Sequence, residues 1–220
     1  DNVSQKEIFK QSEGDAWFER NKDVLKKRNF EADPLVLELK HLLNAELIDA
    51  NKKIDILEVG CGEGSRGQFI SKIIDCNFYG IDPSKKAVKV ANSKGIVASQ
   101  GSADKLPYKN NQFDIIIYGF CLYLCDRQDL PLISKEASRV LKDSSWLLIM
   151  DFFSDSASEN EYMHLENIKS FKMDYRKIFE NDSSYCCYSH KIIDHENHQY
   201  TDIKENWISI SAMRLSLIHI

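Results

Sequence analysis

The sequence predicts an α/β fold with a doubly wound, mostly parallel sheet and helices on both faces. Short β-branched runs alternate with helically spaced apolar residues between positions 54 and 150. The run 113–118 is apolar on both faces, as expected of a strand inside a parallel sheet. A chain of 220 residues is long enough for one sizeable core, so we expect a single domain over 1–220.

The first fifty residues carry a helical pattern. Apolar residues recur there at three- and four-residue spacing. Asp33 before Pro34 is typical of a helix start, with Asp as the cap and Pro at the first helical position. The segment 13–20 holds the adjacent aromatic residues Trp17 and Phe18, which would either close a lid over a binding site or pack in the core.

Five strands and the helices between them follow in order. Strands are predicted at 54–59, 77–81, 95–98, 113–118 and 146–150. Helices are predicted after the first strand up to residue 74, from the cap Ser84 to Gly95, and over 129–141. Beyond residue 151 the pattern loosens. We predict helix over 156–180 and an antiparallel hairpin of 185–193 with 207–213 at the sheet edge.

Composition limits the partners and the chemistry. The net charge of −5 argues against duplex nucleic acid, and the basic run 22–28 is interpreted as a solvated helix face. No apolar run approaches the roughly 18 residues of a membrane helix, and residues 1–7 lack a signal-peptide pattern. No Cys-x-x-Cys pair occurs, and 195–198 (HENH) lacks a third ligand, so no metal is expected. We expect reduced thiols, mostly small core residues, in a cytoplasmic protein.

A glycine cluster marks the predicted ligand site. Four of the nine glycines lie between the first strand and its helix: Gly60, Gly62, Gly64 and Gly67. Such a loop lets a ligand approach the backbone, although a tight turn without a ligand has the same pattern. Gly62-x-Gly64-x-x-Gly67 matches the dinucleotide fingerprint, with acidic Asp82 at the expected distance. The alternative frame is Glu58-x-Gly60-x-Gly62-x-Gly64, with an acidic residue at the strand end.

Four motifs in order resemble those of the class I S-adenosylmethionine-dependent methyltransferases of the small-molecule type. Residues 56–64 (ILEVGCGEG) resemble motif I, and residues 80–84 (GIDPS) resemble the second-strand motif. Residues 101–108 (GSADKLPY) are similar to the adenine-contact loop, and 113–114 (FD) to the family's fourth strand. Residues 139–142 (RVLK) and 151–152 (DF) are similar to the segments before and after the fifth strand. Residues 142–145 depart from the family's frequent Pro-Gly-Gly. The resemblance implies a Rossmann-like fold with S-adenosyl-L-methionine as cofactor.

The resemblance also implies a role for each residue of the glycine loop. Backbone groups of Gly60, Cys61 and Gly62 would face the methionyl part of the cofactor, and Gly64 belongs to the same loop. Glu58 would lie near the cofactor's ammonium, directly or through water. A structural alternative is that Glu58 only caps a neighbouring helix end.

The second-strand and adenine-loop motifs would hold the nucleoside. Asp82 would accept hydrogen bonds from both ribose hydroxyls, and Pro83 would pack on the adenine ring. The backbone at Ala103 and the carboxylate of Asp104 would contact the ring nitrogen and the exocyclic amine. Asp82 as a helix cap and Asp104 as a surface turn residue are the structural alternatives.

The acceptor would lie over the sulfonium, where Tyr118 and Gly119 end the fourth strand and contact the methionine portion, unless Tyr118 is a core residue. The Asn-Pro-Pro-Tyr signature of amino-methylating DNA enzymes is absent there. His164 is the candidate base, with a structural histidine as the alternative. The polar and aromatic C-terminal segment favours a small polar acceptor, such as a sugar or nucleotide-sugar, over a lipid.

Two other functions stay open. The chain could be a methyltransferase-like binding or partner subunit without turnover, although the residues expected to contact the cofactor are intact. An NAD-dependent oxidoreductase would need a Tyr-x-x-x-Lys or equivalent after the fourth strand, and none is found. In the methyltransferase interpretation, residues 1–50 form a helical lid, 54–152 the cofactor-binding core, and 153–220 the substrate side and edge hairpin.

Overall fold

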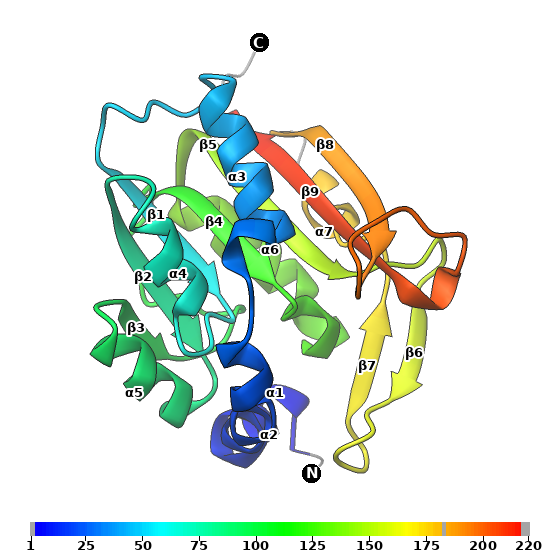
Figure 1. Ribbon diagram of the computed structural model, residues 1–220. Helices are drawn as coiled ribbons and strands as arrows, with labels where there is room; N and C mark the ends of the chain where they lie inside the picture. The colour runs from blue at the N-terminus through cyan, green and yellow to red at the C-terminus, as the bar shows by residue number, and fades with distance from the viewer. Residues whose placement is uncertain (1–2, 182–183, 217–220) are drawn as a thin grey trace.

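The computed structural model describes residues 3–181 and 184–216 and contains a seven-stranded mixed sheet (Figure 1). The strand order is β3-β2-β1-β4-β5-β9-β8. It reverses between β1 and β4, the kind of switch point at which open α/β sheets bind ligands. The strands are β1 (Ile54–Val59), β2 (Cys76–Asp82), β3 (Val97–Gln100), β4 (Phe113–Gly119), β5 (Leu141–Phe152), β8 (Tyr185–Asp194) and β9 (Trp207–Leu215).

Five parallel strands and one antiparallel hairpin make up this sheet. β1 pairs in parallel with both β2 and β4, so that Val59 lies opposite Ile81 on one side and Tyr118 on the other. β9 runs antiparallel to β5 and carries β8 at the edge, with Trp146 opposite Arg214. The doubly wound sheet and the C-terminal edge hairpin predicted from the sequence are both confirmed.

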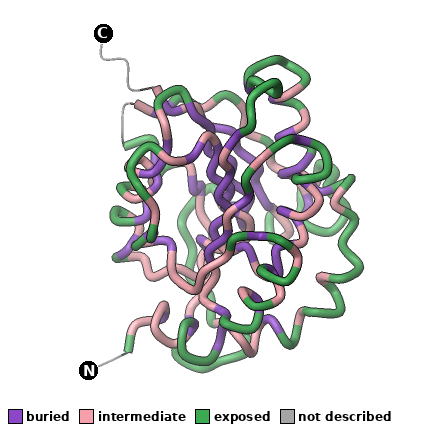
Figure 2. The backbone as a smooth tube through the Cα atoms, turned by 90° about the vertical axis from the view of Figure 1, so that its left-hand side faces the viewer, coloured by how far each residue is buried: buried purple, intermediate pink, exposed green. Residues whose placement is uncertain are grey.

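Apolar side chains cover both faces of the sheet. Ile56 and Ile117 point to the face covered by α3, α4 and α5, whereas Leu57 and Ile116 point to the face covered by α6 and α7. This alternation follows from the two-residue period of a strand. Figure 2 shows the buried segments gathered in the middle of the molecule. The helices are α3 (Pro34–Asn44), α4 (Ser65–Ile70), α5 (Lys85–Ser93), α6 (Leu130–Val140) and α7 (Lys177–Glu180).

The N-terminal segment folds into helices, as predicted. Asp33 caps α3, because its Oδ1 accepts hydrogen bonds from the backbone N–H groups of Leu35 and Val36 at 3.1 and 3.2 Å. A π-helical turn, η1, joins the first two helices, and such turns are rare and frequently lie at functional sites. The elements are α1 (Gln5–Ile8), η1 (Phe9–Glu13) and α2 (Gly14–Lys26).

The prediction of helix over 156–180 is wrong. This segment forms a separate two-stranded sheet, β6 (Ser158–Glu161) with β7 (Lys169–Lys172), followed by the short α7. The strands pair antiparallel, with Ser158 opposite Lys172. All four residues of β6 are polar and exposed, so the apolar alternation that identifies a strand in a sequence is missing.

Two smaller predictions also need correction. β5 begins at Leu141 rather than 146, because Leu141 pairs with Phe113 across an irregularity in the β4–β5 register. The six cysteines are free, and the expectation of mostly core thiols holds in part: Cys61 is buried, whereas Cys76, Cys121 and Cys125 are partly buried against the core. Within the described residues, no helix combines the length and apolar character needed to cross a membrane.

Candidate active site

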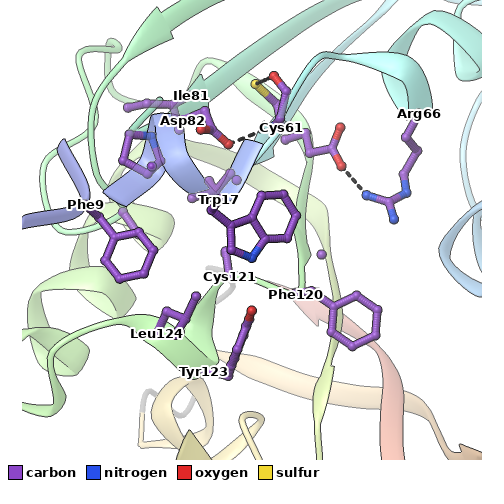
Figure 3. Close-up of a pocket in the computed structure, with 18 of the residues that line it drawn as sticks. Phe9, Trp17, Cys61, Arg66, Ile81, Asp82, Phe120, Cys121, Tyr123 and Leu124 are labelled. Atoms are coloured by element: carbon purple, nitrogen blue, oxygen red, sulfur yellow. Dashed lines mark hydrogen bonds and ion pairs between the residues drawn. The ribbon is translucent and has the colours of Figure 1, made fainter. Parts of the chain in front are cut away.

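A cavity of about 400 Å³ lies at the carboxyl ends of β1, β2 and β4, with N-terminal residues on its opposite wall. Figure 3 shows the indole of Trp17 between the Asp82 side of this cavity and the rings of Phe120 and Tyr123. The predicted site residues that the structure brings together in its lining are Glu58, Gly60, Cys61, Gly62, Asp82, Pro83, Ala103 and Gly119.

The glycine loop approaches the cavity through left-handed backbone. Gly60 has φ +75°, and a Cβ there would lie 2.6 Å from the Cβ of Cys121, so no larger residue fits. The N–H groups of Gly60 and Cys61 both donate to the carbonyl of Ile81, which ties the loop to the end of β2. Gly64 is the cap of α4 and does not line the cavity, so its part is to turn the chain.

Asp82 presents a buried carboxylate to the cavity. Its Oδ2 accepts a hydrogen bond from the N–H of Gly62 at 2.8 Å, and its Oδ1 accepts one from Ser84 at 2.9 Å. Burial raises the pKa of Asp82 to about 6, although both backbone donors oppose the shift. A carboxylate fixed by the backbone with lone pairs to spare suits two vicinal hydroxyl donors.

Glu58 lies in a buried ion cluster at the end of β1. Arg66 contacts Glu58 Oε1 through Nη1, and its Nη2 lies 3.1 Å from Asp33 Oδ2. Burial raises the pKa of Glu58 despite the charge of Arg66. Glu58 Oε2 is buried without a hydrogen-bond partner among the described residues, and Glu58 lines the cavity. A buried unpaired carboxylate oxygen calls for a donor from a ligand, and an ammonium group fits.

Arg28 is a cavity-lining residue that the sequence interpretation did not place at the site. It stands in the basic run 22–28, yet its side chain lines the cavity. Burial lowers the pKa of its guanidinium, and the charge of Arg66 adds to this effect. None of the described residues forms an ion pair with Arg28, so it is available for an anionic group of a ligand. Arg28 lies two residues beyond the end of α2, and nothing in the local sequence pattern links it to the glycine loop.

The purine end of the site differs from the expectation. Ala103 and Pro83 line the cavity, whereas Asp104 does not. Lys6 of α1 lines it instead, and its Nζ lies 2.7 Å from Asp104 Oδ2. The Asp104 carboxylate, which was expected to contact an adenine amine, is therefore paired with the side-chain ammonium of Lys6.

At the end of β4 the backbone, rather than the tyrosine ring, faces the site. Tyr118 is fully buried, and its ring packs against Phe179 on the α6–α7 face of the sheet. Gly119 lines the cavity, together with Phe120 and the next residue, Cys121. Burial raises the pKa of the Cys121 thiol well above its ordinary value, which disfavours a thiolate nucleophile.

The structure does not bring His164 to the cavity. His164 is exposed in the turn between β6 and β7, where its ring lies edge-on to Tyr162. His195 lines the cavity instead, from the turn after β8. Its ring lies edge-on to Phe152, with centroids 6.3 Å apart. From the sequence, His195 was considered only as a metal ligand, because nothing in the local pattern linked 195–198 to the glycine loop.

The N-terminal helices close one wall of the cavity. Phe9 and Trp17 line it, whereas Phe18 is buried outside the lining. Gly14 lets this wall lie directly on the loop after β2, because a Cβ there would be 2.6 Å from the carbonyl oxygen of Phe9 and 3.2 Å from the carbonyl carbon of Pro83. Of the two aromatic residues considered for a lid, Trp17 thus faces the cavity, whereas Phe18 packs in the core.

Part of the chain is similar to a methyltransferase family and to proteins named as methyltransferases. Residues 57–149 match the family model described as "Methyltransferase domain". The chain is 30% identical over 125 residues to "Uncharacterized methyltransferase YcgJ" of Bacillus subtilis (strain 168), covering 52% of this chain and 47% of that protein. It is 27% identical over 139 residues to "Glycine/sarcosine/dimethylglycine N-methyltransferase" of Actinopolyspora halophila, covering 56% and 24%. The chain therefore spans less than half the length of these two relatives.

Solved structures share the fold at low sequence identity. One is the Burkholderia thailandensis 1,6-didemethyltoxoflavin-N1-methyltransferase, crystallised with 1,6-didemethyltoxoflavin and S-adenosylhomocysteine, with TM-score 0.70, 12% identity and coverage of 98% and 92%. Another is a SAM-dependent methyltransferase from Methanosarcina mazei, with TM-score 0.65, 14% identity and coverage of 80% and 98%. The motif residues are thus gathered around one cavity, in a segment that is similar to the methyltransferase domain model and shares the fold of these solved methyltransferases.

Proposed function

We propose that this chain transfers the methyl group of S-adenosylmethionine to a small polar acceptor, with sugars and nucleotide-sugars as the first class to test. The observation that carries the proposal is the pair of carboxylates in the cavity. Glu58 offers a buried oxygen without a hydrogen-bond partner among the described residues, and Asp82 offers a carboxylate whose two oxygens accept from the N–H groups of Gly62 and Ser84. A zwitterionic amino acid joined to a ribose would satisfy both.

The bound cofactor supplies an activated methyl group, and the residues of the chain position it. Asp82 would accept the ribose hydroxyls, Glu58 the methionyl ammonium, and Arg28 would donate to the methionyl carboxylate. Phe9 and Trp17 would exclude water from the reacting groups. Methyl transfer is an in-line displacement, so alignment and removal of water lower its barrier most.

The acceptor half of the cavity is aromatic. Phe120, Tyr123 and Phe152 form one cluster, with ring centroids about 5 Å apart. Among the described lining residues, the carboxylates are Glu58, Glu63 and Asp82, none of them in this cluster. Such a wall suits a neutral ring that presents C–H groups to aromatic faces, as a sugar does. The relatives are named for different acceptors, so similarity alone selects none.

The same proposal places the reaction in the cytoplasm. All six cysteines are free, including Cys121 and Cys125, which line the cavity near one another in sequence. Free thiols at such positions suit a reducing compartment.

His195 is the proposed base for acceptors that must lose a proton. The Tyr123 hydroxyl and the Cys121 thiol stay protonated near neutral pH, because burial raises the pKa of both groups. Neither can therefore accept a proton from the acceptor. We expect His195→Gln to lower kcat about 100-fold at saturating acceptor, within the usual range for a general base. His164→Gln is the matched control and should leave kcat unchanged; equal losses in both variants would refute the assignment.

Transfer of a radiolabelled methyl group to defined acceptors tests the function. Purified protein would be incubated with labelled S-adenosylmethionine and separate sets of nucleotide-sugars, free sugars, small amines and small carboxylic acids. Label in the sugar sets supports the proposal in full, and label in the amine or acid sets corrects the acceptor class. Tight binding of S-adenosylhomocysteine without transfer to any set would favour a binding or partner subunit.

A further inference from the structure

The turn after β4 carries two of the three rings of the acceptor wall, by which we mean the cavity-lining cluster Phe120, Tyr123 and Phe152. The centroid of the Phe152 ring lies 5.1 Å from that of Phe120 and 5.0 Å from that of Tyr123. Phe120 has φ +53°, in the left-handed region that a bulky residue keeps only when its surroundings hold it there. Its N–H donates to the carbonyl of Met150 at 2.8 Å, which ties the turn to the end of β5.

One buried carboxylate, that of Asp151 in β5, accepts the free N–H groups of this turn. The first N–H groups of the short 3₁₀ helix η3 (Leu122–Leu124) have no partner within it, and the preceding Cys121 does not cap them. Asp151 Oδ2 accepts hydrogen bonds from the N–H groups of Leu122 at 2.8 Å and Tyr123 at 3.3 Å. Its Oδ1 accepts one from the N–H of Phe152 at 2.9 Å. The same side chain therefore holds the backbone of two residues of the acceptor wall.

The carbonyl side of the turn is held by other side chains. Arg127 donates to the carbonyl of Leu122 and, at 2.8 Å, to that of Cys125, and its guanidinium lies over the ring of Phe171. The side chain of Gln5 donates to the carbonyl of Leu124 at 2.6 Å. A change at Asp151 is therefore expected to shift the N–H side of the turn without unfolding it.

Asp151 is the group of this region whose charge changes near neutral pH. It is fully buried, and burial raises its pKa to about 7, although the three N–H groups and the charge of Arg127 oppose the shift. The titratable groups that face it are the thiols of Cys121 and Cys125, the hydroxyls of Tyr123 and Tyr175, and the guanidinium of Arg127. Burial raises the pKa of both thiols and both hydroxyls, so these four groups stay protonated near neutral pH.

We propose that Asp151 is the positioning residue of the acceptor wall. Its ionised carboxylate holds the turn so that Tyr123 faces Phe152 and Phe120 keeps its left-handed backbone. A proton on Asp151 removes the charge and replaces a lone pair by an O–H donor, which weakens the hold on the N–H groups. Asp151 does not line the cavity, so the cofactor is not affected directly. This inference deepens the proposed function, because it takes the acceptor wall as the place where the acceptor binds.

Fluorine NMR tests the position of the wall without an acceptor. Unliganded protein labelled with 3-fluorotyrosine would be titrated from about pH 5.5 to 8.5, and the resonance of Tyr123 would be assigned by its absence from Tyr123→Phe. In wild type this resonance should shift with a midpoint near pH 7. In Asp151→Asn, which is neutral at every pH, it should stay near the low-pH position of wild type.

Asp114→Asn is the matched control, because Asp114 also accepts a backbone N–H at 2.8 Å, on the neighbouring strand β4, but does not line the cavity. This variant should titrate like wild type. His195→Gln removes the imidazole beside Phe152 and should leave the titration in place. A pH-independent resonance in wild type, an unchanged titration in Asp151→Asn, or its loss in His195→Gln would each overturn the proposal.

Methyl transfer to UDP-glucose, used as the probe, separates this inference from the proposed function. At about pH 8, Asp151→Asn should raise the KM for UDP-glucose about tenfold with the affinity for S-adenosylhomocysteine unchanged, and the difference from wild type should shrink at about pH 6. An unchanged KM would overturn the role of Asp151 in acceptor binding. If wild type bound S-adenosylhomocysteine but did not methylate UDP-glucose, the proposed acceptor would be wrong, and the Tyr123 resonance would still decide whether Asp151 positions the wall.

Discussion

Asp82→Ala is expected to weaken the binding of S-adenosylhomocysteine by about a hundredfold or more. Two ribose hydroxyls would lose a charged acceptor, and each such hydrogen bond contributes about 1.5–3 kcal/mol. The substitution also removes the partner of the Gly62 and Ser84 N–H groups, which hold the loops on either side of the ribose site. Isothermal titration of purified wild type and variant measures the effect directly.

Asp55→Ala is the matched control for this experiment. Asp55 is an aspartate of the neighbouring strand β1, but it lies near the amino end, where its carboxylate contacts Asn77 and Lys142. Asp55 does not line the cavity, so the affinity of Asp55→Ala for S-adenosylhomocysteine should match that of wild type. A similar loss in both variants would point to general destabilisation, and no loss in Asp82→Ala would remove Asp82 from the site. NAD, titrated in parallel, should bind to neither protein.

The same carboxylate makes the affinity depend on pH. Burial raises the pKa of Asp82 from 3.8 to about 6. As the pH falls through about 6, the carboxylate takes up a proton, and the unliganded protein no longer has a charge buried at this position. The ribose hydroxyls need the ionised form. Affinity should therefore be constant above pH 7 and fall as the pH drops below about 6. Burial also raises the pKa of Asp151, to about 7, so Asp151 titrates in a similar pH range, but it does not line the cavity. In Asp82→Asn this pH dependence should disappear.

The sheet could be predicted because β1, β4 and β5 each contain an apolar run and the predicted helices separate the strands at regular intervals. The hairpin β6–β7 could not, because four polar exposed residues such as Ser158–Glu161 carry no periodic signal. The orientation of Tyr118 was also beyond the sequence. Residues 115–118 are buried on both faces of the sheet, so the pattern does not say which face holds the last side chain.

The meeting of the glycine loop with Asp82 could be predicted because both follow neighbouring parallel strands at the same edge of the sheet. Gly60, Gly62 and Asp82 meet through short loops after neighbouring strands. Lys6 lies in α1 and Arg28 lies just beyond the end of α2, both outside the motifs, and Lys6 is 98 residues from its partner Asp104. His195 lies in the turn after β8, and β9 separates β8 from β5 in the sheet. The ring of His195 nevertheless contacts that of Phe152 in β5, so its place at the cavity depends on the strand order. Such long-range meetings depend on strand order, which periodicity does not encode.

Arg66→Met is expected to lower the free energy of unfolding by about 3–5 kcal/mol, because removing one member of a buried ion cluster leaves uncompensated charges. Arg66 is 5% exposed, and its partners Glu58 and Asp33 are 1% and 6% exposed. The cluster joins three elements, since Asp33 caps α3, Arg66 lies in α4 and Glu58 in β1. Urea unfolding monitored by fluorescence and circular dichroism measures the change.

Lys142→Met provides the contrast with an exposed ion pair. Lys142 contacts Asp114 and Asp55, but its side chain is 37% exposed, so its loss should change the stability by at most about 1 kcal/mol. Acid should narrow the gap between Arg66→Met and wild type, because the unpaired carboxylates of the variant can then take up protons. A double variant with Asp33→Asn should recover part of the loss, since it leaves one buried carboxylate instead of two. If Arg66→Met were as stable as Lys142→Met, the guanidinium of Arg28 would have to pair with Glu58 and Asp33 in place of Arg66. Arg28 would then no longer be available for the methionyl carboxylate, and the same variant would bind S-adenosylhomocysteine more weakly.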